Sequence, residues 1–135
     1  MEISIDTTVK AAIEQVWSAW VTSDDIKKWN FASDDWRCPD AKIDLRVGGR
    51  FSSRMEAKDG SMGFNFEGTF TSIITNSSIE YVLDDDRKVS VSFSETENGI
   101  KVVETFETED ENSAELQRQG WQCILDNFKK YVEAK

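Results

Sequence analysis

The sequence predicts an α+β domain in which a curved antiparallel sheet wraps around one long C-terminal helix. Three observations predict this fold class. Apolar residues recur every three or four positions over residues 112–135, which indicates an amphipathic helix. Apolar and polar residues alternate through most of residues 42–106, which indicates about six consecutive strands. Gly48-Gly49 and Asn98-Gly99 separate neighbouring strands, as expected of antiparallel hairpins.

The N-terminal region predicts one strand followed by a helix. Ile3 and Ile5 alternate with polar residues over residues 2–8, so we expect a half-buried strand there and not a signal peptide. Thr8 is a suitable N-cap for a helix over residues 9–21, whose apolar face carries bulky side chains.

A second, shorter helix and an ordered loop are expected next. Ser23 can cap this helix, and Ile26 and Trp29 form its buried side. Residues 30–41 contain the only proline, Pro39, and show no clear periodicity, so they predict the loop.

Six strands are then expected from the period-two alternation. An antiparallel meander of this kind has one apolar face to bury, and the C-terminal helix is the only element long enough to cover it. A gap between a curved sheet and one helix is a common ligand site. The predicted strands cover residues 42–47, 50–58, 64–71, 79–83, 89–94 and 100–106.

The C-terminal helix carries start signals and one unfavourable residue. Asn112 is predicted as its N-cap, and Glu115 completes a capping box three residues later. Gly120 stands within the helix, where glycine costs roughly 1 kcal/mol relative to alanine. A position without a side chain there indicates either close packing against a strand or space left open.

Composition restricts the class of protein. A chain of 135 residues predicts a single domain, residues 1–135, with a real core, and we expect a monomer. The net charge of −10 disfavours binding to nucleic acid or to an anionic membrane surface. No stretch approaches the roughly 20 apolar residues that membrane insertion requires. Two cysteines, Cys38 and Cys123, do not form a disulfide framework, so a cytoplasmic location with free thiols is expected.

Histidine is absent from the sequence. Its absence removes Ser-His-Asp and Cys-His catalysis together with the commonest metal ligand. The triplet Asp84-Asp85-Asp86 lacks the glycine and the distal glutamate of a calcium loop, so a solvated turn is expected there. We therefore expect neither a metal nor a cofactor.

Three motifs resemble a known family. They are Val16-Trp17-Ser18-Ala19-Trp20, the hairpin of residues 44–51, and Gly120-Trp121 followed by residues 124–128. Together with the order of elements, they resemble the helix-grip fold of the START-like (SRPBCC, polyketide cyclase-like) superfamily. Within it, the chain is similar to bacterial single-domain members of the family named for homologues of the activator of the heat-shock-protein-90 ATPase. This resemblance implies a hydrophobic cavity and members that bind small apolar molecules.

Glu104 is the one candidate catalytic residue. Strand parity places it between Val102 and Phe106, on the face that we assign to the interior. A buried lone carboxyl has a raised pKa unless it is paired, so it can orient a ligand hydroxyl or act as a general acid or base. The alternatives are that Glu104 pairs with an arginine, or that a bulge turns it outward.

The remaining candidates are predicted to surround a ligand. Phe31 and Trp36 belong to the loop expected to cover one end of the cavity, either as an aromatic lid or as ordinary packing anchors. Four arginines, Arg37, Arg46, Arg50 and Arg54, can either converge on an anion or pair with surface acids. The other predicted ligand-binding residues are Phe51, Ser53, Phe66, Tyr81, Val91, Glu104, Phe106, Trp121 and Leu125.

Two hypotheses for function come from the sequence, and the family name adds a third. The preferred one is binding of a small lipid-like or aromatic molecule, because no nucleophile–base pair can be assembled from these residues. The second is an enzyme of the cyclase, aromatase or hydrolase kind that uses Glu104 as acid or base. The third, a chaperone-linked interaction module in the stress response, rests on the name of the similar family alone.

Overall fold

The computed structural model describes residues 1–135 as one seven-stranded antiparallel sheet and three helices. The strand order in the sheet is β1-β7-β6-β5-β4-β3-β2, so only the β1–β7 pair joins strands that are distant in the chain. This arrangement confirms the predicted α+β helix-grip fold. The elements are β1 (Glu2–Val9), α1 (Ile13–Val21), α2 (Ser23–Trp29), β2 (Trp36–Ile43), β3 (Arg50–Ala57), β4 (Gly63–Ile74), β5 (Ser78–Leu83), β6 (Lys88–Thr96), β7 (Gly99–Glu107) and α3 (Ala114–Glu133).

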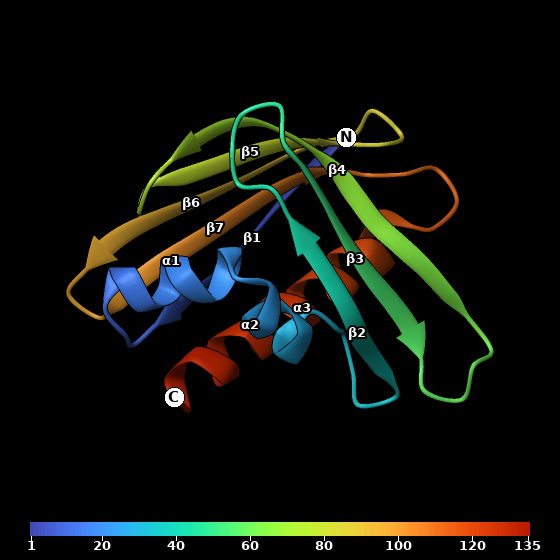
Figure 1. Ribbon diagram of the computed structural model, residues 1–135, viewed down its shortest axis with the longest axis horizontal. Helices are drawn as coiled ribbons and strands as arrows, with labels where there is room; N and C mark the ends of the chain where they lie inside the picture. The colour runs from blue at the N-terminus through green and yellow to red at the C-terminus, as the bar shows by residue number, and fades with distance from the viewer.

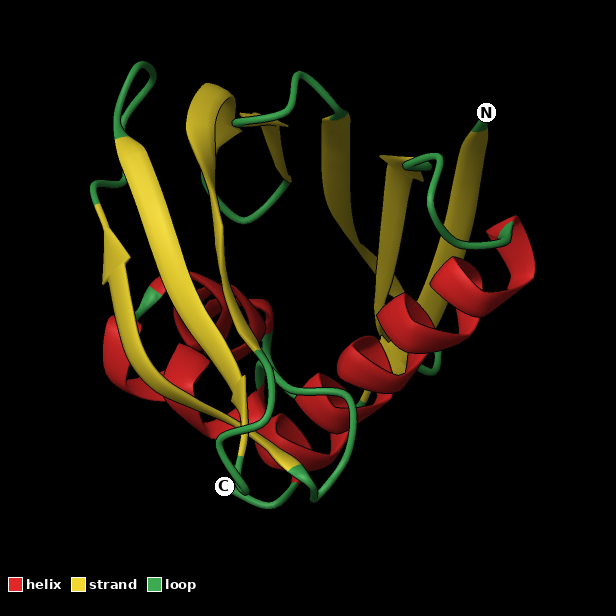
Figure 2. Cartoon of the chain, turned by 90° about the vertical axis from the view of Figure 1, so that its right-hand side faces the viewer, coloured by secondary structure: helices red, strands yellow, loops and turns green.

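The sheet curls, and α3 lies across its concave side (Figure 1). Figure 2 shows the same arrangement from the side, with the strands curving around the helices. At the two edges of the sheet, α3 packs along β1 and α2 packs along β2. None of the three helices combines the length and the apolar character that a membrane span requires.

The C-terminal half of α3 supplies the centre of the core. Leu125 and Phe128 are completely buried, and Val132 is nearly so. The Phe128 ring packs edge-on against Trp20 and Trp29, with both pairs of ring centroids 4.8 Å apart. Aromatic pairs in this geometry are worth about 0.5–1.5 kcal/mol beyond their burial. This cluster fills one end of the hollow beneath the sheet.

The predicted helix caps were wrong for all three helices. The N-cap of α2 is Thr22, and Ser23 is already the first residue of that helix. Thr8 is still paired with Lys101 in the β1–β7 ladder, so α1 begins only after Ala12. Ser113, and not Asn112, caps α3, and its hydroxyl accepts a hydrogen bond from the Leu116 amide over 3.1 Å. Asn112 is engaged elsewhere, because its side-chain amide donates to Glu109 over 3.0 Å.

The loop predicted over residues 30–41 and the strand predicted over 42–47 were also wrong. The chain pairs with β3 from Trp36 to Ile43 and turns over residues 44–49. Pro39 lies where the β2–β3 register shifts, at the edge of the sheet, where the missing N–H of proline is tolerated. Val47 continues the apolar alternation but is 63% exposed, so alternation alone was misleading here.

Candidate functional site

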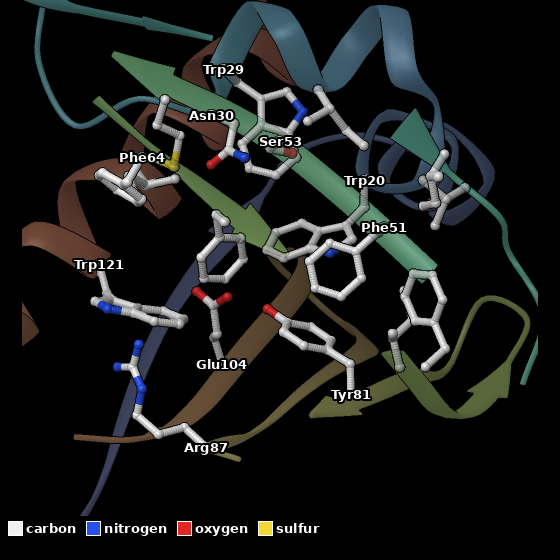
Figure 3. A pocket seen from close by; sticks show the side chains of 18 of the residues that line it. Trp20, Trp29, Asn30, Phe51, Ser53, Phe64, Tyr81, Arg87, Glu104 and Trp121 are labelled. Carbon is white, nitrogen blue, oxygen red and sulfur yellow. The ribbon is translucent and has the colours of Figure 1, made fainter. Parts of the chain in front are cut away.

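A cavity of about 400 Å³ lies between the concave face of the sheet and the N-terminal half of α3. Most of its wall is apolar and much of it is aromatic (Figure 3). The rings come from every layer of the fold: Trp20 from α1, Trp29 from α2, Phe51, Phe64, Phe66, Phe70 and Tyr81 from the sheet, and Trp121 from α3.

One wall is built around a glycine in the sheet. Phe51 on β3 is paired with Gly68 on β4, so its ring occupies the space between Phe66 and Phe70. A Cβ at Gly68 would meet the Val82 carbonyl oxygen at 2.4 Å, so this position accepts no side chain. The absence of a side chain lets the strands approach closely and lets the Phe51 ring lie over them.

Trp121 forms the opposite wall. It stacks flat on Phe106, with ring centroids 4.1 Å apart and planes 7° from parallel. It also meets the edge of Phe66 at 5.7 Å. One side chain of α3 therefore touches rings of both β7 and β4, and it bridges the hollow without filling it.

Glu104 is buried among these apolar groups. It is paired with Ile5 on β1 and Val91 on β6, and only 6% of its surface is exposed. Burial raises the pKa of Glu104 from 4.5 to about 8, with no ion pair to offset it. The carboxyl group is therefore mostly protonated at neutral pH, and the predicted inward orientation is what the structure has.

Tyr81 lies close to this carboxyl group. It is also only 6% exposed, and burial together with Glu104 raises the pKa of its hydroxyl well above the usual value. Its hydroxyl and the Glu104 carboxyl group point toward the same part of the cavity (Figure 3). Neither group hydrogen-bonds to another protein group, and neither is sealed off from the cavity.

Polar residues form one rim of the cavity. The Nε of Arg87 donates to Asp85 over 2.8 Å. Gln117 closes the β7–α3 loop, because its amide donates to the Glu109 and Asn112 carbonyl oxygens at 3.0 and 2.8 Å. Its own carbonyl oxygen accepts from the Glu109 amide at 2.9 Å. These bonds tie the start of α3 to the loop that precedes it.

Nine predicted ligand-binding residues lie on the concave side, but not all reach the cavity. Val91, Phe106 and Leu125 are completely buried behind the wall, with Phe106 directly beneath Trp121. Strand and helix periodicity identify the inward face but not the depth of a residue below the cavity surface. Those that do line the cavity are Phe51, Ser53, Phe66, Tyr81, Glu104 and Trp121.

The residues predicted as a lid lie outside the lining. Phe31 lies in a separate groove with Cys123 and Asp126. Trp36 begins β2, and its ring is 6.0 Å from that of Phe64, a residue that does line the cavity. Trp36 is partly buried and contacts the lining through Phe64.

Several lining residues were missed from the sequence. Trp20 was named only within a motif and Trp29 only as part of a buried helix face, although the apolar periodicity of both helices makes them candidates. Phe70 and Ile79 share the inward parity of their strands. Arg87 and Gln117 had no sequence signal, because their positions follow from how two loops meet.

The four arginines do not form an anion site. Arg37 and Arg54 both pair with Glu56, at 2.6 and 3.2 Å. Arg50 pairs with Asp84, and Arg46 pairs with Asp44, each at 2.8 Å. The alternative of surface pairing with acids is therefore the one observed.

Comparison with known proteins places this geometry in a family. The family model described as Activator of Hsp90 ATPase homolog 1-like protein matches residues 10–133. No curated protein matches the chain. The solution structure of an AHSA1-like protein from Aeromonas hydrophila is 48% identical, with a TM-score of 0.93 over 99% of this chain and 93% of that one. A protein from Cytophaga hutchinsonii is 46% identical, with a TM-score of 0.85 over 98% and 92%. The chain therefore belongs to the family of Activator of Hsp90 ATPase homolog 1-like proteins.

Proposed function

We propose that the protein binds a small apolar molecule, lipid-like or aromatic, in the cavity between the sheet and α3. The observation that carries this proposal is an aromatic-walled cavity of about 400 Å³. Small-molecule sites are typically apolar hollows of roughly 300–1,000 Å³ with few polar groups. A ligand there would gain roughly 25 cal/mol for each Å² of apolar surface removed from water.

The anchoring of α3 also supports binding. Phe128 and Leu125 are buried in the core, and the Asn127 side-chain amide donates to the Trp29 carbonyl oxygen over 2.8 Å. The helix is therefore held in place by contacts outside the cavity. A ligand that enters a preformed site loses little affinity to ordering the protein.

Native mass spectrometry of the protein freshly purified from its host tests the proposal. We expect an additional mass that corresponds to one non-covalently bound organic molecule. After extraction, adding the recovered molecule back should change the tryptophan fluorescence, because Trp20, Trp29 and Trp121 line the cavity.

A pair of variants on α3 separates the cavity from the rest of the helix. Ile124 lines the cavity, so Ile124→Phe should reduce its volume and abolish the bound mass. Leu116 is 56% exposed, so Leu116→Phe adds the same ring outside the cavity, and this variant should still carry the bound mass. Equal retention by both folded variants would place the bound molecule elsewhere and refute the proposal.

A second candidate is an enzyme of the cyclase, aromatase or hydrolase kind. Its support is the buried carboxyl group of Glu104, whose pKa of about 8 suits a general acid or base near neutral pH. If the recovered molecule is converted by the protein, Glu104→Gln should abolish turnover and leave affinity largely intact. The chaperone-linked hypothesis has only the family name in its support.

A further inference from the structure

We propose that Tyr81 and Glu104 form a pair of hydrogen-bond donors that selects flat apolar molecules carrying a carbonyl oxygen. This inference rests on the proposed function and names the class of ligand for the same cavity. The chemistry is that of an apolar ketone or aldehyde, whose ring system lies among the aromatic side chains and whose oxygen meets both donors.

The sheet brings the two residues together. Tyr81 is on β5 and Glu104 is on β7, with β6 between them. Val91 of β6 is paired with Glu104, and Val89 is paired with Tyr81, so the two side chains lie diagonally across one concave face. Their polar ends point toward the same part of the cavity (Figure 3), so we infer that one ligand oxygen can meet both.

The hydroxyl of Tyr81 and the carboxyl group of Glu104 have hydrogen-bonding capacity that no other protein group uses. Each residue is only 6% exposed, and neither hydroxyl nor carboxyl group is hydrogen-bonded within the chain. Gln117, another buried polar residue of the cavity lining, uses both ends of its side-chain amide in hydrogen bonds within the protein. No fully buried side-chain oxygen or nitrogen lacks a partner, so the free oxygens of Tyr81 and Glu104 reach the cavity, where a ligand atom can pair with them.

The protonation state of the pair determines what it accepts. Burial keeps Glu104 neutral at pH 7, so both groups are O–H donors, and a carbonyl oxygen has two lone pairs to accept them. No ion pair reaches Glu104, and the Nε of Arg87 at the rim is bound to Asp85. A cationic ligand would require Glu104 to ionise in an apolar site, and an anionic one would have to lose its hydration there.

Two naphthalene probes of matched shape test the donor pair in the full-length protein. The ketone 2-acetylnaphthalene carries an oxygen where 2-isopropenylnaphthalene carries a CH₂ group. We expect the ketone to bind roughly tenfold more tightly than the hydrocarbon, as followed by tryptophan fluorescence, because a neutral hydrogen bond contributes about 0.5–1.5 kcal/mol. The infrared carbonyl band of the bound ketone should shift to lower frequency.

Variants then assign the preference to the two residues. Tyr81→Phe and Glu104→Met should each lower the ratio of ketone to hydrocarbon affinity roughly three- to tenfold and reverse part of the infrared shift. Glu104→Gln should keep much of the ratio, because the amide still donates.

The ratio of ketone to hydrocarbon affinity should fall in the wild-type protein as the pH rises through 8 and stay constant in Glu104→Gln. Tyr131→Phe is the matched control, because Tyr131 bonds to Asp25 outside the cavity and should leave the ratio unchanged.

The outcomes separate this inference from the function on which it rests. Equal affinity for ketone and hydrocarbon would overturn the donor pair and leave apolar binding intact. Tighter binding of 2-naphthylmethylamine than of the ketone would also overturn it, because Glu104 would then act as an anion. If none of the probes binds and no molecule co-purifies, the proposed function itself fails.

Discussion

At the scale of single residues, Glu104 links stability to pH. Its pKa is about 8 in the folded protein, against 4.5 as its ordinary value. Between these two values the folded state keeps a proton that the unfolded chain has lost. The free energy of unfolding therefore contains a contribution that is fully present below pH 4.5 and is lost as the pH rises through 8.

Replacing Glu104 by a residue that does not ionise should remove its contribution to the pH dependence of the free energy of unfolding. Between pH 5 and pH 8, the wild type should lose stability that Glu104→Gln keeps. The difference in the free energy of unfolding between the two proteins should therefore grow by a few kcal/mol, at about 1.4 kcal/mol for each unit of pKa difference. Urea unfolding at several pH values measures this difference. Glu80→Gln, at an exposed position of β5, is the control and should show no such trend. Parallel curves for Glu104→Gln and the wild type would contradict the burial of an unpaired carboxyl group.

At the scale of elements, α3 has two different halves. Its N-terminal half lines the cavity with Trp121 and Ile124, and its C-terminal half is buried through Leu125 and Phe128. The Lys129 ammonium group donates to the Thr8 carbonyl oxygen on β1 over 2.7 Å, which holds the second half to the edge of the sheet. One helix thus both closes the core and leaves a hollow.

Gly120 lies in the N-terminal half of α3 and can be replaced. A Cβ built there meets no atom within 4 Å, so of the two alternatives raised by the sequence, the glycine stands beside open space. Gly120→Ala should raise the free energy of unfolding by about 0.5–1 kcal/mol, because alanine is the better helix former. Thermal or urea unfolding measures the change.

Gly68 provides the contrasting substitution. A Cβ at this position would meet the Val82 carbonyl oxygen at 2.4 Å, so Gly68→Ala should destabilise the protein by about 1–3 kcal/mol. Equal effects of the two glycine-to-alanine changes would show that backbone freedom, and not space, decides both positions.

At the scale of the whole molecule, one core joins all layers. The cluster of 22 buried residues includes Val16 of α1, Trp29 of α2, Phe128 of α3 and members of the sheet. The β1–β7 pairing further ties the start of the chain to the strand that precedes α3. No helix or strand can unfold alone without exposing apolar surface of its neighbours to water.

Unfolding should therefore be a single cooperative transition, as expected of one domain over residues 1–135. Tryptophan fluorescence reports on the core and the cavity, and far-ultraviolet circular dichroism reports on helix and sheet. We expect the two midpoints to coincide. A separate early loss of helix signal would show that α3 unfolds independently and would contradict a one-domain chain.

Local signals were enough for most elements, because periodicity and turn residues act over a few positions. The alternation around Phe66 and Glu104 gave the correct faces of β4 and β7, and Asn98-Gly99 gave the correct hairpin. The errors arose where a distant segment competes. Residues 36–43 form a strand because β3 offers them a pairing partner. Thr8 stays in β1 because it pairs with Lys101 on β7.

The sequence by itself determined the order of elements and the inward faces of the strands, with Glu104 among the residues assigned to the interior. Only the tertiary structure decided that Trp121 covers Phe106, that Tyr81 and Glu104 share one part of the cavity, and that Arg87 stands at its rim. The physical reason is the distance along the chain over which each interaction acts. The periodicity of a strand or helix is set by its own backbone, whereas the depth of a side chain depends on which distant residues pack over it.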